Sequence, residues 1–450
     1  MQTQFTSRFA FLMVTAGAAV GLGNIWAFPF VAGQSGGSGF IAIYLVALLV
    51  LAAPAMICEL VLGRMGQASP PTALARVKVE NTGKGPWSLF GWSGLAVNIL
   101  VLSFYAVIAG QAAYFGYYAF SEGFSSMQPS AISALDNGFK INMNLSMLWT
   151  ILFLGATLTI VSLNITKGIE NAGRYLMPSL FVLLIGLALY SMSIGNAKAA
   201  LNFLFGMDSF SLTTGVFMAA VGQAFFTLSV GICSLMMYGA YMGKDIHLPK
   251  AVSWIVLMDL MVAIIAGLVI FPLVFASDVT PDAGPGLIFM TLPLLFAKLP
   301  AGDAVATFFF LMLTVAALTS SISMMAPVVA RLEEAGLRRI TGAFIVAGIA
   351  FVLSFMTILS FGPMYDYYPL EMFEATAELN MFELLREGIN NIYLPLGGLA
   401  FTLLVGWGVR KENLRRGFNI EEGPLFSILH WIIKYLTPFL LLVMIAGIWL

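Results

Sequence analysis

Long apolar runs, separated by short polar segments, fill almost the whole chain. An α-helix needs about 20 apolar residues to cross a bilayer. Eleven runs approach or exceed that length, at roughly residues 9–32, 37–62, 87–119, 147–163, 170–193, 213–241, 250–276, 304–330, 341–361, 389–409 and 431–450. The connections contain no soluble domain and no low-complexity linker. The pattern predicts an all-α polytopic membrane protein in which residues 1–450 form one transmembrane domain.

Small residues interrupt two of these runs near their centres. The first run carries three glycines within residues 17–24, and the sixth is interrupted at Ser229-Val230-Gly231. A helix broken inside hydrocarbon must find other partners for its freed backbone groups. Breaks at matching positions of two repeats indicate the binding site of a secondary transporter.

The two broken runs lie five spans apart. Because five is odd, the second set of five spans enters the membrane from the opposite side, as an inverted repeat requires. We therefore expect inverted repeats at about residues 9–193 and 213–409, followed by an extra helix at about 431–450. Among the outer connections, 277–303 is expected to fold back as short helices, and the acidic, aromatic segment 361–378 to lie at an outer interface.

Charge sets the expected orientation and excludes several functions. Sixteen lysines and arginines fall in the loops of one side and four in those of the other, which predicts a cytoplasmic N-terminus and an extracytoplasmic Leu450. We expect no cleavable signal peptide. A net charge of −1 gives no reason to expect binding to nucleic acid. Both cysteines lie in membrane spans, which argues against a disulfide, and with only two histidines a transition-metal site is not expected.

Polar side chains near the two breaks are candidate cation ligands. Asn24 follows the first break, and Thr227 and Ser229 lie at the second. Asp259 sits at the centre of an apolar span, where a carboxylate costs at least about 2.5 kcal/mol. Each has a structural alternative: a helix cap for Asn24, hydrogen bonds to their own backbone for the hydroxyls, and a protonated or hydrogen-bonded acid for Asp259. Glu59 is interpreted as part of a structural network with the nearby Arg64.

Hydroxyls also cluster in the eighth span, where four of the five residues from Thr319 to Ser323 carry one. Small residues with hydroxyls are typical of close helix packing. Their density favours a second cation site built from hard oxygen ligands.

Five motifs carry a resemblance to a known family. They are Gly17-Ala-Ala-Val-Gly-Leu-Gly-Asn-Ile-Trp26, Glu59-Leu-Val-Leu-Gly-Arg64, Ser103-Phe-Tyr105, Gly222-Gln-Ala-Phe-Phe-Thr-Leu-Ser229 and Thr319-Ser-Ser321. In this order, over almost the whole chain, they resemble the bacterial amino-acid transporter branch of the neurotransmitter:sodium symporter family, in its eleven-span form. The resemblance implies a 5+5 inverted-repeat, leucine-transporter-like fold with broken helices 1 and 6.

The resemblance also implies site residues. A first sodium site would use Ala19, Asn24, Thr227 and Asp259, and a second Gly17, Val20, Ala316, Thr319 and Ser320. Substrate would meet Gly21, Leu22, Gly23, Val101, Tyr105, Phe226, Thr227, Ser229, Ile232, Ser320, Ser323 and Met324. The gates would involve Phe226, Arg386, Phe5 and Glu334. Gly168 and Pro178 have the spacing of the family's inner unwinding motif.

The chain departs from the family pattern at both gates. Ala27 stands where an arginine is usual, and Arg386 falls where its acidic partner is expected, with Glu383 and Glu387 nearby. At the inner gate Gln2 and Phe5 replace the usual arginine and tryptophan, so Glu334 would need another partner, for which Arg8 is a candidate. Ala263 replaces a serine of chloride-dependent members, so no chloride requirement is expected.

These observations predict a sodium-coupled symporter that imports a neutral, hydrophobic α-amino acid in a bacterial plasma (inner) membrane, and not an enzyme. Gly21 favours a substrate with its own carboxylate, since monoamine carriers of the family place an aspartate there. A transport-deficient amino-acid sensor or a channel-like member is the alternative reading. A carrier for a non-α or sulfonated amino acid is a further one, because of Arg386. Homo-oligomerisation is left open.

Overall fold

The computed structural model describes residues 4–81, 85–125, 127–206, 213–277, 288–362, 364 and 379–447, and in that part of the chain every regular element is helical. The first repeat comprises α1 (Arg8–Ala19), η1 (Gly23–Ala27), α2 (Phe28–Gln34), α3 (Ser38–Ala47), η2 (Leu48–Ala52), α4 (Ala53–Gly66), α6 (Trp87–Ser121), α8 (Met143–Ser162), η3 (Thr166–Glu170) and α9 (Asn171–Ile194). The η elements are π-helical turns.

The second half continues with α11 (Thr214–Thr227), α12 (Ser234–Ala240), α13 (Leu248–Phe275), α15 (Gly302–Glu334), α16 (Arg339–Phe361), α17 (Met381–Glu387), η6 (Gly388–Tyr393), α18 (Leu394–Leu403) and η7 (Leu404–Gly408). The extra span consists of α20 (Pro424–Trp431), η8 (Ile432–Leu436) and α21 (Thr437–Gly447). Shorter helices in the connections are α5 (Pro70–Asn81), α7 (Pro129–Ile141), α10 (Ala197–Phe205), α14 (Thr291–Phe296) and α19 (Lys411–Phe418).

The eleven predicted spans agree with these elements. Among the described residues, nine helices are long and apolar enough to cross a membrane, and the pair Arg8–Ala19 and Gly23–Gln34 forms a tenth span bent by 51°. The broken pair α11 and α12 supplies the remaining one. Helix α14 is one of the short helices expected within 277–303. Residues 278–287 of that connection, Gln2, most of 361–378 and the last three residues of the extra helix lie outside the described residues.

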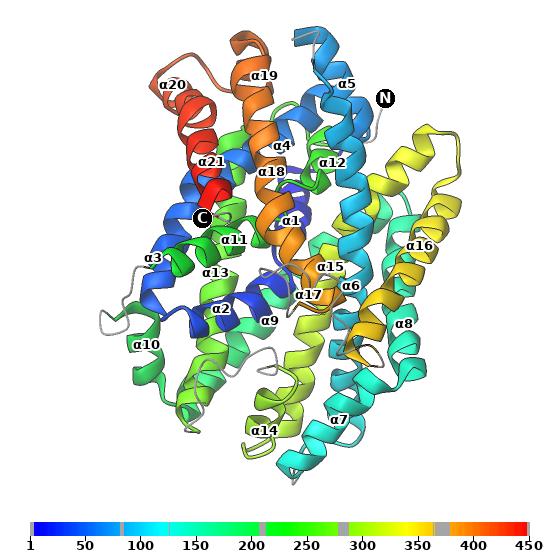
Figure 1. The fold of residues 1–450 in the computed structure, drawn as a ribbon, viewed down its shortest axis with the longest axis vertical. Coiled ribbons are helices and arrows are strands. Elements are labelled where there is room, and N and C mark those ends of the chain that lie inside the picture. The colour runs from blue at the N-terminus through cyan, green and yellow to red at the C-terminus, as the bar shows by residue number, and fades with distance from the viewer. Residues whose placement is uncertain are drawn as a thin grey trace.

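The helices pack so that the broken elements lie inside the bundle. α1 contacts α9, α13 and α15, and α12 contacts α4. In Figure 1 the N-terminal end, α5 and α19 lie at the top, while α7, α10 and α14 lie at the opposite end. The loops richest in lysine and arginine therefore share one end of the molecule.

The first break is held open by side chains. α1 ends at Ala19, and Val20 takes an extended conformation with φ −76° and ψ 114°. The Gly21 amide then donates to Asn24 Oδ1 at 3.0 Å, and the Leu22 amide donates to Tyr105 Oη at 3.2 Å. Two backbone amides that a continuous helix would satisfy internally are thus paired with polar side chains.

The second break uses left-handed backbone conformations. Between α11 and α12, φ is 53° at Ser229, 100° at Gly231 and 67° at Cys233. The buried Glu59 carboxylate accepts hydrogen bonds from the amides of Gly231 and Leu235, both at 2.9 Å. Glu59 therefore replaces the backbone partners that the break removes at the start of α12.

The expected link between Glu59 and Arg64 is wrong. Arg64 donates instead to four backbone carbonyls, those of Gly243, Lys244, Ile246 and Gly417. Arg64 follows Glu59 by five residues on α4, so the two charged groups leave the helix in different directions and contact different neighbours. Arg64 ties the segment after α12 to α19, while Glu59 holds the break itself.

The Glu59→Gln variant tests this account of the second break. A glutamine can accept one of the two amide bonds but turns its NH2 group toward the other donor. We expect a loss of about 1–3 kcal/mol in the free energy of unfolding, measured as a lower thermal midpoint in detergent. The exposed Glu421→Gln variant should stay within about 0.5 kcal/mol of the parent. Equal midpoints for all three proteins would contradict the role of Glu59.

Candidate functional site

Asp259 lies buried in α13 between the two breaks. Its Oδ1 accepts hydrogen bonds from Asn24 Nδ2 at 2.7 Å and from Thr227 Oγ1 at 2.9 Å, and its Oδ2 accepts one from Tyr44 Oη at 3.3 Å. Asn24 Nδ2 also contacts the Asp259 carbonyl at 3.2 Å. The structure thus gathers Asn24, Thr227 and Asp259 as predicted, with Ala19 as the last residue of α1.

The partners of Asp259 are all neutral. Within the described part of the chain, none of the ion pairs includes Asp259. Three neutral donors satisfy the lone pairs of a carboxylate but leave its charge uncompensated, and a buried charge is costly without a counter-ion. Amide, hydroxyl and carboxylate oxygens are the hard ligands that an alkali cation prefers. This arrangement can hold one monovalent cation.

Tyr44 was missed by the sequence reasoning. It lies in α3, fully buried, and its ring packs edge-on against Phe28 at 5.1 Å between centroids. A tyrosine in an apolar run gives no local signal that its hydroxyl reaches a carboxylate more than 200 residues away.

The second oxygen cluster lies where α15 meets the end of α1. The Val20 carbonyl accepts hydrogen bonds from Ser320 Oγ at 3.2 Å and Thr319 Oγ1 at 3.5 Å, and Thr319 also donates to the Ala316 carbonyl at 2.9 Å. Gly17 faces the same place, since a Cβ built on it would lie 3.2 Å from Thr319 Cβ. The predicted second set is therefore brought together.

Side chains of other helices pack tightly against the glycines of the first break. A Cβ built on Gly21 would lie 2.8 Å from Tyr105 Oη and closer still to Ser320 Oγ. A Cβ on Gly23 would lie 3.1 Å from the Phe226 ring. The hydroxyls of Tyr105 and Ser320 therefore pack so closely against Gly21 that only glycine fits there. The Leu22 amide and the Tyr105 hydroxyl contact each other at this place, and both are groups that can donate to an anion.

A small apolar cavity of about 20 Å³ lies beside the second break. Five predicted pocket residues line it: Val101, Phe226, Ser229, Ile232 and Met324. Span ten adds three that the sequence reasoning missed: Ile389, Asn390 and Leu394. Ser323, also predicted there, donates to the Ser320 carbonyl at 2.7 Å and is absent from the lining.

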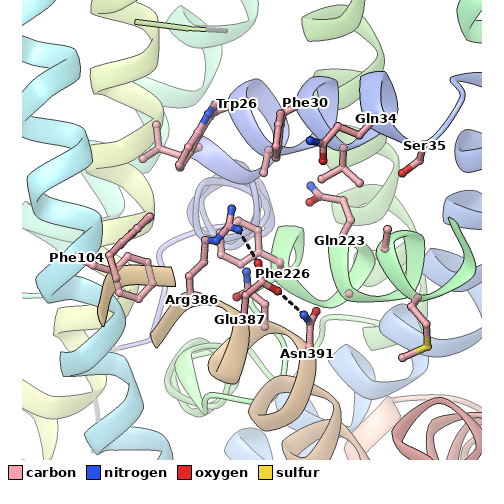
Figure 2. Close-up of a pocket in the computed structure, with 18 of the residues that line it drawn as sticks. Trp26, Phe30, Gln34, Ser35, Phe104, Gln223, Phe226, Arg386, Glu387 and Asn391 are labelled. Atoms are coloured by element: carbon pink, nitrogen blue, oxygen red, sulfur yellow. Dashed lines mark hydrogen bonds and ion pairs between the residues drawn. The ribbon is translucent and has the colours of Figure 1, made fainter. Parts of the chain in front are cut away.

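A larger cavity of about 460 Å³ lies on the other side of Phe226, which borders both. Figure 2 shows its aromatic walls, Trp26, Phe30 and Phe104, with Arg386 and Glu387 reaching in from span ten. Gln223, missed from sequence, donates from Nε2 to the Gly23 carbonyl at 2.7 Å. Phe226 and Asn390 thus line both the small pocket and the larger cavity, which is called the vestibule below.

The ion pair of the vestibule is local. Arg386 Nη2 lies 2.5 Å from Glu387 Oε1, and Glu387 Oε2 accepts from Asn391 Nδ2 at 2.5 Å (Figure 2). Ala27 also lines the cavity and contributes no charge. The predicted gate residue Arg386 is present, and its acid is its own neighbour rather than a residue of span one.

At the opposite end of α1, the chain before the helix is fastened to span five. The Thr6 amide donates to Glu170 Oε2 at 3.0 Å, the Thr6 hydroxyl also contacts Glu170, and Arg174 Nη2 lies 2.9 Å from Glu170 Oε1. Glu170 belongs to η3, which also contains Gly168. The sequence reasoning named Gly168 and Pro178 and missed Glu170, whose spacing of four residues from Arg174 was its one available signal.

Phe5, the predicted inner-gate residue, is buried beside this fastening. Its amide donates to the Tyr241 carbonyl at 3.1 Å, and its ring lies 5.9 Å from Phe11 and 6.3 Å from Tyr238, centroid to centroid. Phe5 therefore packs against α12 at this end of the bundle.

Glu334 has partners other than the expected Arg8. Its carboxylate accepts hydrogen bonds from the Ser69 amide at 2.6 Å, from Ser69 Oγ at 2.5 Å and from Thr72 Oγ1 at 2.8 Å. Arg8 is exposed and takes part in none of the ion pairs of the described residues. Neutral donors near the start of α5 thus replace the basic partner.

Comparison with known proteins settles the family. Residues 2–142 and 129–393 match the sequence profile described as "Sodium:neurotransmitter symporter family". The chain belongs to this family. An uncharacterized sodium-dependent transporter, YhdH, of Bacillus subtilis is 31% identical over 450 residues, covering 99% of this chain and 97% of the relative. A sodium-dependent transporter of Haemophilus influenzae is 27% identical, covering 98% and 96%.

A solved structure matches the whole fold. The crystal structure of MhsT in complex with L-phenylalanine superposes with a TM-score of 0.91 at 34% identity, covering 100% of both chains. The symporter is therefore a multi-pass membrane protein with the leucine-transporter-like fold, a sodium-dependent transporter and not an enzyme. The family and fold predicted from the motifs are confirmed.

The Asp259→Asn variant tests the first cation cluster. Asparagine keeps the size and most hydrogen bonds but removes the charge that a cation would neutralise. We expect sodium chloride, compared with equimolar potassium chloride, to raise the thermal midpoint of the parent and of the exposed Glu412→Gln control. The midpoint of Asp259→Asn should no longer respond at concentrations that saturate the parent. A sodium response equal to the parent's would exclude Asp259 as a ligand.

Proposed function

We propose that the symporter imports a neutral, hydrophobic α-amino acid together with sodium by alternating access. The observation that carries this proposal is the pair of polar groups at the first break. The Leu22 amide and the Tyr105 hydroxyl meet at 3.2 Å against Gly21, and Asn24 links the Gly21 amide to the buried carboxylate of Asp259. An α-carboxylate there would accept hydrogen bonds from both donors and share a cation with Asp259.

Two sodium ions are proposed, with separate roles. The first would bind Asp259, Asn24, Thr227 and the Ala19 carbonyl, next to the substrate carboxylate, so that substrate and ion stabilise each other. The second would bind Thr319, Ser320 and the carbonyls of Gly17, Val20 and Ala316. It would join α15 to α1, and its binding would favour the arrangement in which these two helices lie together.

The side-chain pocket supports an apolar substrate. Val101, Ile232, Met324, Ile389 and Leu394 supply most of the lining of the inner cavity, and neither a basic nor an acidic side chain is among its lining residues. A charged side chain would enter this space without a counter-charge, at a cost of several kcal/mol. The MhsT complex with L-phenylalanine supports the same class, because that protein matches this chain over its whole length.

Alternating access would use the two ends of the first span. On the outside, Phe226 would close over the substrate beneath the vestibule. On the inside, release would require Phe5 to leave Tyr241 and Thr6 to leave Glu170. The π-turn η3 and Pro178 within α9 provide the weak points at which span five can unwind. The basic end of the molecule, with the N-terminus, would face the cytoplasm.

Uptake into proteoliposomes tests the proposal. An inward sodium gradient should drive accumulation of labelled neutral amino acids, and an equal potassium gradient should not. Tyr105→Phe removes one donor to the carboxylate and should weaken apparent affinity about 10-fold, equivalent to 1.4 kcal/mol. Gly21→Ala should abolish uptake because its Cβ would collide with Tyr105 and Ser320. Wild-type affinity in both variants would overturn the placement of the carboxylate.

Two other outcomes would point to the alternatives. Sodium-dependent substrate binding without accumulation would identify a transport-deficient sensor, and currents above carrier rates would identify a channel-like member. Competition by a sulfonated rather than a carboxylated amino acid would favour a role for Arg386 in selecting an acidic ligand.

Chloride independence is a separate expectation. Asp259 already provides a fixed negative charge near the first cation, and Ala263, one turn further along α13, offers no hydroxyl to an anion. We expect uptake to be unchanged when gluconate replaces chloride on both sides of the vesicle. Loss of uptake in gluconate would show that an anion completes the site.

A further inference from the structure

Lys434 lies in the last span, outside everything described for the transport site. It belongs to η8 and packs against the end of span ten: a Cβ built on Gly406 would lie 2.8 Å from Lys434 Cα. Trp407 Nε1 donates to the Lys434 carbonyl at 2.9 Å. Span ten ends at Gly408, and α19 begins with Lys411. Lys434 is therefore level with the border of the membrane on the side rich in basic loops.

Aromatic rings surround the ammonium group. Lys434 Nζ lies 4.3 Å from the centroid of the Trp407 ring and 5.5 Å from that of Tyr435. Trp407 and Tyr435 pack edge to face at 5.5 Å, and Trp431 continues the row at 6.4 Å from Tyr435. Trp407, Trp431 and Tyr435 are 60%, 53% and 46% exposed. Exposed tryptophan and tyrosine at the end of a span belong at the lipid headgroups.

The charge of Lys434 has no acidic partner among the described residues. None of their five ion pairs includes it, and the aromatic rings attract the ammonium without neutralising it. A second positive charge belongs to the same neighbourhood: Lys411 begins α19, three residues after span ten ends at Gly408, and both it and Lys434 act electrostatically on the buried His430. Glu422 is engaged with Arg415 at 2.8 Å, and Glu412 lies exposed on α19.

We propose that Lys434, Lys411, Trp407, Trp431 and Tyr435 form a binding site for the headgroup of an anionic phospholipid in the leaflet on the basic side. The lipid phosphate supplies the negative charge that the cluster lacks, and the ring edges of Trp431 and Tyr435 cover the glycerol region. Because Trp407 closes span ten and Lys434 lies in the extra span, the headgroup bridges these two elements. The proposal depends on membrane topology and not on the transported substrate.

Native mass spectrometry of the full-length protein in detergent tests the site. The protein is titrated with phosphatidylglycerol or with phosphatidylcholine, and retained lipid is counted. We expect preferential retention of phosphatidylglycerol. Lys434→Gln should weaken its affinity about 5-fold, because one basic side chain near an anionic headgroup contributes about 1 kcal/mol. Lys434→Arg should restore it, and Lys250→Gln, an exposed lysine at the start of α13, should leave it unchanged.

A second variant separates the site from simple destabilisation. Trp407→Phe keeps a ring over the ammonium but removes the hydrogen bond to the Lys434 carbonyl, so its preference for phosphatidylglycerol should persist. Equal losses in Lys434→Gln and Lys250→Gln would overturn the proposal, as would equal retention of both lipids. Displacement of the lipid by millimolar inorganic phosphate would show a site for the free anion and would also count against it.

Discussion

Two interruptions of hydrogen-bonded helix inside the membrane govern the rest of this structure. Backbone groups that lose their helical partners in hydrocarbon must be satisfied by something else. In this chain, side chains take that part: Glu59 holds the amides of Gly231 and Leu235, and Asn24 holds that of Gly21. The Gly23 carbonyl is paired with Gln223. Carbonyls at the end of α1 are held by hydroxyls in the same way: that of Ala18 by Ser229 and that of Val20 by Thr319 and Ser320.

The same constraint explains why the candidate site is polar only in a narrow layer. Asp259 is fully buried and accepts three hydrogen bonds, all from neutral groups. Neutral hydrogen-bond donors orient a carboxylate but cannot cancel its charge. A bound cation would therefore stabilise the cluster more than a further neutral donor would. Outside this layer, the pocket is lined by apolar side chains, among them Val101, Ile232 and Met324. In the proposed binding mode, the groups that hold the ion and those that select the side chain would therefore be separate.

Residues of the candidate site could be predicted from the sequence where their immediate neighbours in the chain made them unusual. Both breaks, Asp259 and the hydroxyl run of span eight stand out because each contradicts the apolar run around it. Tyr44, Gln223 and Glu170 were missed because their roles depend on partners 164 to 215 residues away. The two incorrect pairings, Glu59 with Arg64 and Glu334 with Arg8, came from matching opposite charges. In the structure, backbone groups and hydroxyls satisfy Arg64 and Glu334 instead.

The gates differ in the kind of contact that holds them. Arg386 and Glu387 are neighbours on α17, so their ion pair cannot fasten span ten to span one. In the proposed cycle, closure of the outer side would rest on apolar contact of Phe226 with the substrate in the pocket beside it. At the inner end, Glu170 fastens Thr6 across 164 residues of chain by direct hydrogen bonds. A ligand shifts such an equilibrium only by its differential affinity for the two states. A substrate that fills the apolar pocket supplies that difference at the outer lid, since each buried methylene is worth about 0.8 kcal/mol. In the proposed cycle, substrate size and closure of the outer side would therefore be coupled through Phe226, whereas opening of the inner end would break polar contacts that the substrate does not touch.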